Sequence, residues 1–185
     1  MAPAGPTPRT TPMSTSTVHA ALSEHAAERI LVFDGAMGTM VQTFELDEAE
    51  FRGERFTDHS LDLRGNADVL SLTRPELVAS IHDRFLAAGA DLLTTNTFNA
   101  NAIAQADYGL ETSVGDLNRA AAQLAKAACA EWSAQTPGQP RFAAGSPSPA
   151  NGRCKTVPSH WSRLRGICSA NPCARRCCAP GSGRS

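Results

Sequence analysis

The first 144 residues of this 185-residue chain contain a single cysteine, Cys129, although the whole chain has six. One cysteine excludes a disulfide framework there and fits a reducing compartment, so we expect a cytoplasmic protein. No apolar run approaches the roughly 18 residues of a membrane span, and no contact with a membrane is expected. The histidines, including His59 and His82, lack the spacing of a metal site. We expect His82 at the surface or its boundary and Cys129 in the interior.

Residues 145–185 contain no aspartate or glutamate, whereas seven of the 17 basic residues lie there. The rest of the chain has ten basic and 18 acidic residues, so the two parts have opposite net charge. Five cysteines also lie in 145–185, without the repeated C-x-x-C of a structural zinc site. We predict a disordered leader at 1–17, a folded domain at 18–151 and an unstructured, basic, cysteine-rich tail at 152–185.

Hydrophobic patterning within the folded part predicts strands and helices in alternation. The predicted strands are 30–33, 91–95 and the start of a further strand at 141–145, and the predicted helices are 18–29, 75–88 and 114–132. This alternation predicts an α/β protein with a parallel sheet and right-handed crossovers.

The helix at 75–88 has the clearest boundaries. Thr73 and Glu76 predict a capping box, Pro75 suits the first turn, and Gly89 suits a left-handed residue after the last turn. The predicted buried faces of the two long helices are Leu77, Val78, Ile81 and Phe85 in the first, and Leu117, Ala121, Leu124 and Ala128 in the second.

Small and polar residues directly follow two predicted strands, where parallel α/β proteins place binding sites. Two glycines can expose backbone N–H groups to a carboxylate, Asp34 can accept from an ammonium, and the Asn96 amide can donate and accept. The alternatives are a glycine turn that only links strand to helix, and an asparagine that only satisfies loop backbone groups. The predicted substrate-binding residues are Asp34, Gly35, Ala36, Met37, Gly38, Asn96 and Thr97.

Three segments in this order resemble the homocysteine S-methyltransferase family, in particular the homocysteine-binding domain of cobalamin-dependent methionine synthases. They are Phe33-Asp34-Gly35-Ala36-Met37-Gly38-Thr39-Met40, then Asn66-Ala67-Asp68-Val69-Leu70-Ser71-Leu72-Thr73-Arg74-Pro75-Glu76, then Ala88-Gly89-Ala90-Asp91 leading to Thr95-Asn96-Thr97-Phe98. The resemblance covers roughly residues 28–145. It implies a TIM barrel with a further strand near 69–72, and a loop at 34–38 that holds the amino and carboxylate groups of homocysteine.

The resemblance also implies zinc, held by three cysteines on later strands, and methylcobalamin as the methyl donor, recharged by methyltetrahydrofolate. No segment of this chain aligns with those cysteines, because Cys177-Cys178 follows Arg175-Arg176 where the family has two glycines. A complete eight-stranded barrel needs about 250 residues. We therefore expect a truncated, partial (β/α)8 barrel of roughly the first four β/α units, and a reading-frame change near 146–153 as the origin of the tail.

Three functions remain open. An active zinc methyltransferase would require the missing zinc ligands, and a non-catalytic binding module could use its basic tail on nucleic acid phosphates. We favour an inactive fragment of the homocysteine-binding domain, with no catalytic or metal-ligating residues. It is expected to bind neither zinc nor cobalamin, to bind homocysteine weakly or not at all, and not to bind nucleic acid. Its exposed sheet edge favours self-association.

Overall fold

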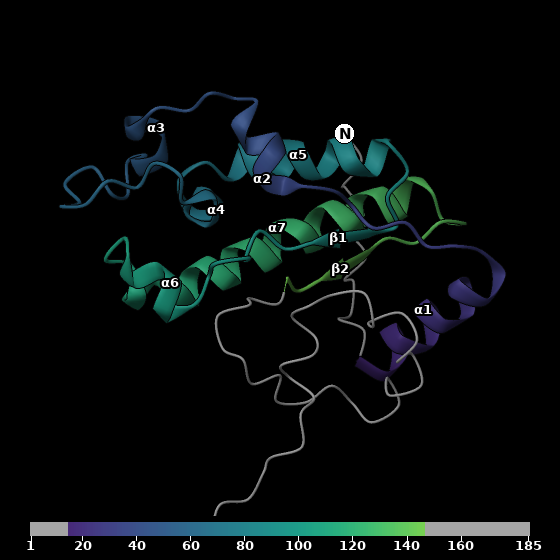
Figure 1. Ribbon diagram of the computed structural model, residues 1–185. Helices are drawn as coiled ribbons and strands as arrows, with labels where there is room; N and C mark the ends of the chain where they lie inside the picture. Colours follow the sequence, from purple (N-terminus) through teal and green to yellow (C-terminus); the bar gives the residue numbers. More distant parts are fainter. Residues whose placement is uncertain (1–14, 147–185) are drawn as a thin grey trace, which may run out of the picture.

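The computed structural model describes residues 15–146, so the predictions for residues 1–14 and 147–185 lie outside the described range (Figure 1). The elements are the helices α1 (Thr15–Glu28), α2 (Met37–Gln42), α3 (Glu48–Arg52), α4 (Leu70–Thr73), α5 (Pro75–Ala87), α6 (Ala102–Ala106) and α7 (Val114–Gln135), the 3-10 helices η1 (Ala67–Val69) and η2 (Glu111–Ser113), and the strands β1 (Leu92–Thr94) and β2 (Phe142–Ala144).

The sheet is small and parallel, as predicted. β1 pairs with β2 so that Leu92 lies opposite Phe142. On its other side, β1 meets the segment around Phe33: the N–H of Leu92 donates to the carbonyl of Val32 at 3.1 Å, and the N–H of Asp34 donates to the carbonyl of Leu92 at 2.9 Å. The order across the sheet is therefore the segment around Phe33, then β1, then β2. The strands predicted at 91–95 and 141–145 are confirmed, each as three residues.

The other two predicted strands are wrong in different ways. Residues 30–33 form only one bridge, between Phe33 and Leu92, and the side chain of Ile30 is 88% exposed. Residues 69–72 are helical, in η1 and α4. The hydrophobic periodicity of a short buried apolar run such as 69–72 does not distinguish a strand from a helix. The packing of the neighbouring elements determines which of the two forms. Because this run is helical, the segment around Phe33 pairs directly with β1.

Helix α5 is confirmed at its predicted position, and its end follows the predicted chemistry. Gly89 has φ of 102°, which is the left-handed conformation that glycine adopts most readily. The N–H of Gly89 donates to the carbonyl of Leu86, and the N–H of Ala90 donates to that of Phe85, both at 3.0 Å. These two bonds form a Schellman motif that satisfies the last carbonyls of the helix.

The capping box predicted at the start of α5 is absent. Thr73 is the last residue of α4, and its hydroxyl donates to the carbonyl of Val69 in that helix at 3.4 Å. Glu76 accepts from the Nε of Arg74 at 2.7 Å instead of reaching back to the helix N-terminus. Because Thr73 belongs to α4, its hydroxyl is not available at the position that the box requires.

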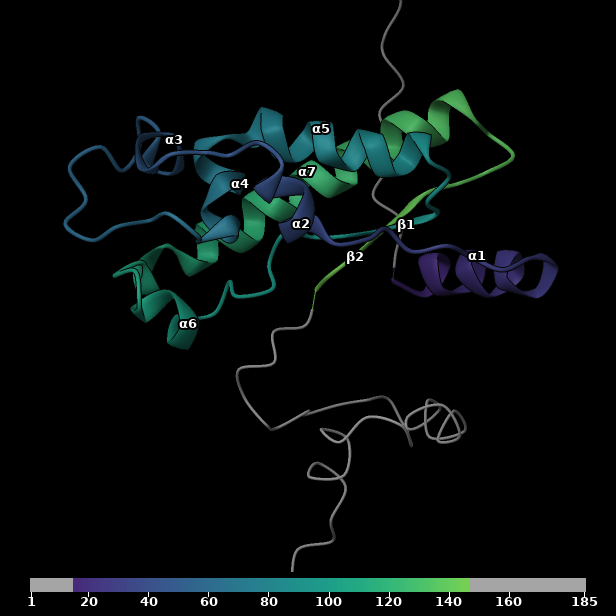
Figure 2. The ribbon, with the colours of Figure 1, turned by 45° about the horizontal axis from the view of Figure 1, so that its top comes forward.

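Helices α5 and α7 pack on each other and on the same face of the sheet (Figures 1 and 2). Helix α7 is confirmed and ends at Gln135, three residues later than predicted. The predicted stripes hold, except that Leu124 and Phe85 are only partly buried. Leu70, Val78, Ile81 and Leu117 are fully buried and form the centre of the main core.

Helix α1 begins at Thr15, three residues before the predicted helix, and so includes the last residues assigned to the leader. It stands at the periphery of the body in Figures 1 and 2 and meets the sheet through the rings of His25 and Phe142, 6.4 Å apart. Its connection to the sheet is fixed by Asp91, at the N-terminal end of β1.

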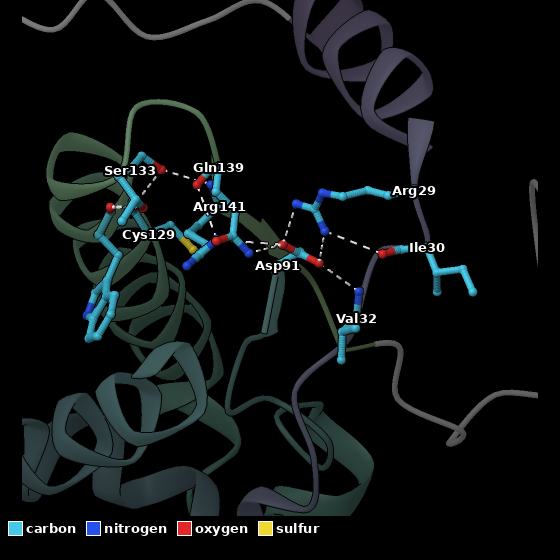
Figure 3. Close-up of polar contacts among 10 residues, drawn as sticks. Arg29, Ile30, Val32, Asp91, Cys129, Ser133, Gln139 and Arg141 are labelled. Atoms are coloured by element: carbon cyan, nitrogen blue, oxygen red, sulfur yellow. Dashed lines mark hydrogen bonds and ion pairs between the residues drawn. The ribbon is translucent and has the colours of Figure 1, made fainter. Parts of the chain in front are cut away.

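Asp91 is completely buried and accepts hydrogen bonds from the segment that follows α1 and from the loop that precedes β2 (Figure 3). Both terminal nitrogens of Arg29 donate to it at 2.7 Å, and so do the N–H of Val32 and the Nε2 of Gln139, each at 2.9 Å. The Arg29 bonds hold the pKa of Asp91 well below its usual range. Arg141 also lies 3.6 Å from the same carboxylate. This network holds the N-terminal ends of the strand segments together. The predicted binding residues lie at the opposite, carboxyl ends.

Candidate functional site at the strand ends

Asp34 and Thr94 lie side by side at the carboxyl ends of two adjacent parallel strand segments. The N–H of Thr94 donates to one oxygen of Asp34 at 2.8 Å, and the Thr94 hydroxyl lies 3.0 and 3.1 Å from the two carboxylate oxygens. A hydroxyl has only one proton to donate, so the half-buried carboxylate keeps lone pairs for a ligand. Burial raises the pKa of Asp34, and the bonds from Thr94 partly oppose that rise.

The residues that follow Asp34 form an open surface rather than a sharp glycine turn. Gly35, Ala36 and Gly38 are exposed, whereas Met37 is partly buried against the core. Neither glycine has a positive φ, because the chain enters α2 at Met37 without reversing sharply. A Cβ on Gly35 would lie 3.2 Å from the Phe85 ring, but one on Gly38 would meet no atom within 4 Å. The absence of a side chain at Gly35 therefore allows the Phe85 ring to pack against the backbone, and at Gly38 it leaves the backbone accessible.

Asn96 is buried, and its amide is hydrogen-bonded to residues of η1 and α4. Its Nδ2 donates to the carbonyl of Ala67 at 2.7 Å and lies 3.3 Å from the hydroxyl of Ser71. These bonds match the alternative interpretation, in which Asn96 satisfies loop backbone groups. Any contact of Asn96 with a ligand stays a prediction. The partners come from η1 and α4, the segment that was expected to be a strand.

Thr97 is also buried and joins β1 to the end of β2. Its hydroxyl lies 2.7 Å from that of Thr95 and 3.4 Å from the carbonyl of Ser146. The N–H of Ser146 in turn lies 3.1 Å from the Thr95 hydroxyl. The structure thus brings all the predicted residues to one end of the sheet, but the side chains of Asp34, Asn96 and Thr97 have different partners.

Two buried polar groups near this end were not predicted. The carboxylate of Asp68 accepts from the N–H of Asn99 at 3.1 Å, and burial raises its pKa. The amides of Asn66 and Gln105 pair with each other at 2.8 and 3.3 Å. Polar residues inside the otherwise apolar run around Val69 were the signal that could have indicated buried, paired side chains.

The described residues do not fit a zinc site built from three cysteines. Between residues 15 and 146, no group of three His, Cys, Asp or Glu side chains is arranged to hold a metal ion. Cys129 is buried on α7, as predicted, and burial raises its pKa to about 11, which keeps it a thiol. Cys154, Cys168, Cys173, Cys177 and Cys178 lie outside the described residues.

His82 is fully buried, so the prediction that it lies at the surface or its boundary is wrong. Both of its ring nitrogens lack a hydrogen-bond partner among the described residues. Burial lowers its pKa to about 4, so the ring is neutral near pH 7.

A parallel sheet with helices packed on it and polar residues at the carboxyl ends of its strands defines an α/β protein, in which a ligand site at those ends stays a prediction. A model of the homocysteine S-methyltransferase family matches residues 31–165, and this chain belongs to that family. The match extends beyond residue 151, so the domain boundary placed there stays a prediction. Within residues 15–146, no helix combines the length and apolar character that crossing a bilayer requires.

Among solved structures, the chain is similar to the homocysteine methyltransferase MmuM from Escherichia coli in its metallated form. The two are 22% identical with a TM-score of 0.53, over 72% of this chain and 41% of that chain. At this sequence identity, the structural similarity shows only that the two proteins have a similar fold. The chain matches less than half of the length of MmuM.

Proposed function

We propose that this chain forms part of a homocysteine-binding barrel and presents the strand-end residues to the amino acid head group of homocysteine. The observation that carries the proposal is the pairing of Asp34 with Thr94. It places a half-buried carboxylate with free lone pairs at the carboxyl ends of two adjacent parallel strands. Membership of the homocysteine S-methyltransferase family supports the choice of ligand.

Each part of the head group has a suitable partner. The carboxylate of Asp34 accepts from the ammonium of homocysteine, and the exposed backbone from Gly35 to Gly38 receives its carboxylate. Asn96 and Thr97 contribute to the wall of the site from the loop that follows β1. Both are held in place by the bonds described above, so they offer a rigid surface rather than free hydrogen-bonding groups.

The methyl transfer reaction is a separate proposal from the binding of homocysteine. By resemblance, the complete enzyme transfers a methyl group from methylcobalamin to the zinc-bound sulfur of homocysteine, as methionine synthases do. The residues between 15 and 146 do not fit the zinc site, because their one cysteine is a buried thiol. We therefore propose that these residues bind the head group and that the chain does not turn over alone.

The substitution Asp34→Asn tests the binding role. Asparagine keeps an oxygen for the Thr94 N–H but loses the charge, so homocysteine should bind about tenfold more weakly or worse. Since the pKa of Asp34 is raised, ionising it at neutral pH costs folding stability, and the variant should unfold at the same or a higher temperature. Titration calorimetry with homocysteine, together with thermal unfolding, measures both effects.

The matched control is Asp58→Asn, at an exposed aspartate in the loop before η1. It should change neither affinity nor stability. Equal homocysteine affinity in the Asp34→Asn variant and the parent would overturn the binding role. Methionine formation by the purified chain, supplied with homocysteine and methylcobalamin, would overturn the proposed lack of turnover.

A further inference from the structure

A cavity of about 590 Å³ lies beside α2 and is bounded by α2, α3 and the loop before η1. Its volume is in the range of small-molecule sites. It meets the strand-end residues only at Gly38. The residues that line it are Gly38, Val41, Gln42, Glu45, Leu46, Phe51, Arg64, Gly65 and Ala67.

The cavity has an apolar floor and a charged rim. Val41, Leu46 and Phe51 are 6–7% exposed and belong to the main core, so their inner faces are fixed by packing. Glu45 and Arg64 are exposed and carry opposite charges. Among the described residues, neither of these two side chains takes part in an ion pair. The rim therefore offers one anion and one cation to a ligand.

Glu45 occupies an unfavourable backbone conformation at this rim. Its φ is 49°, and it is the one residue other than glycine between 15 and 146 with a positive φ. Side chains with a Cβ disfavour this left-handed region, which glycine adopts freely. Its N–H donates to the carbonyl of Gln42 at 3.2 Å, in the turn that follows α2. Glycine would adopt this conformation at lower cost but would remove the carboxylate.

Arg64 is positioned by its backbone, which leaves its guanidinium available. Its N–H donates to Glu48 at 2.7 Å. The Glu48 carboxylate also accepts from the N–H of Leu63 and pairs with Arg52, so its charge is already balanced. The guanidinium of Arg64 can therefore bind a ligand carboxylate through two parallel hydrogen bonds.

We infer that this cavity binds an α-amino acid with an apolar side chain, apart from the homocysteine site. Arg64 receives the carboxylate, Glu45 receives the ammonium, and the side chain covers Val41, Leu46 and Phe51. A zwitterion fits both charges of the rim. An anion without a positive group would be repelled by Glu45, and a cation without a negative group would be repelled by Arg64. The inference does not depend on Asp34 or on methyl transfer.

Calorimetric titration of the full chain with L-norleucine tests this site. Norleucine has both charged groups and a four-carbon side chain. Pentylamine lacks its carboxylate and hexanoate lacks its ammonium, so each should bind at least tenfold more weakly. Absence of norleucine binding at millimolar concentration overturns the inference, and so does equal binding of all three compounds.

Substitutions at the rim assign the binding to this cavity. Arg64→Gln and Glu45→Gln should each weaken norleucine binding at least tenfold, whereas Arg84→Gln, at an exposed arginine on α5, should leave it unchanged. Glu45→Gly should weaken binding and also raise the melting temperature, because glycine accepts the left-handed φ. A purely structural Glu45 would give the higher melting temperature without the loss of affinity, which would overturn its assigned role.

The two sites can be separated with Asp34→Asn. Norleucine has the same head group as homocysteine and can also enter the strand-end site, so Asp34→Asn should weaken the binding of both amino acids at that site. The norleucine binding that Arg64→Gln and Glu45→Gln weaken should remain in Asp34→Asn, even if the proposed methyltransferase function is wrong. If norleucine binding falls in Asp34→Asn but survives Arg64→Gln and Glu45→Gln, the ligand occupies the strand-end site and the inference fails. Circular dichroism of each variant verifies that it is folded.

Discussion

At the scale of single residues, burial changes the chemistry that a side chain type predicts. His82 follows Ile81 on α5 and is buried together with it. Asp34 and Asp91 are both carboxylates with buried or half-buried positions, yet burial raises the pKa of the first, while the Arg29 bonds lower the pKa of the second. The deciding factor is whether a cation is close enough to compensate for lost water.

His82 gives a pH dependence that can be measured. Its pKa is about 4 in the folded chain and about 6.5 when unfolded, so below pH 6.5 the unfolded chain binds more protons. The free energy of unfolding should therefore fall by about 2 kcal/mol between pH 6.5 and pH 5 from this group alone. His82→Leu removes the contribution and should flatten the dependence, as followed by urea unfolding at each pH. An unchanged slope in the variant would contradict the neutral, unpartnered state of His82.

At the scale of elements, the local sequence has its strongest influence on where a helix begins and ends. Pro75 and Gly89 set the bounds of α5 through chemistry that needs no distant partner. The capping box failed for a reason on the same scale, because Thr73 already belongs to α4. A helix boundary can be predicted only when the neighbouring element is also assigned correctly.

Two glycine substitutions should have opposite effects on stability. Gly89→Ala should lower the free energy of unfolding by about 1 kcal/mol, because alanine disfavours the φ of 102°. Gly115→Ala, in the first turn of α7, should raise it by about 0.5–1 kcal/mol, because φ is helical and no atom lies within 4 Å of the new Cβ. Urea unfolding of both variants measures the difference, and changes of the same sign would contradict this account of the α5 terminus.

At the scale of the whole molecule, one outer side of the sheet is poorly covered. Ile30, Val32 and Phe33 are 88%, 52% and 55% exposed, and among residues 15–146 their segment pairs with β1 on one side only. Exposed apolar side chains on an unpaired strand segment favour association with another chain. Whether a second copy covers this edge stays a proposal.

The expected self-association can be measured by light scattering after size-exclusion chromatography. The mass of the parent chain should rise with concentration, whereas the double variant Ile30→Lys and Phe33→Lys should stay monomeric, because charge on the edge opposes pairing. Leu61→Lys, at an exposed leucine outside the sheet, is the control and should behave as the parent does. A parent chain that stays monomeric at all concentrations would refute the prediction.

The sequence by itself determined the long helices, the two short strands, the parallel arrangement and the family. These follow from local periodicity, from capping residues such as Pro75 and Gly89, and from segments such as 33–40 whose order is preserved. They required no knowledge of which residues meet across the fold.

Only the tertiary structure decided the helical state of Val69, the burial of His82 and the partners of Asp34 and Asn96. Asp34 and Thr94 are 60 residues apart in the chain, and no local pattern links them. Hydrogen-bond partners and pKa directions depend on such distant contacts, because burial and the nearest charges are properties of the packed molecule. For this reason the sequence could place the candidate residues at the strand ends, but it could not predict the contacts among them.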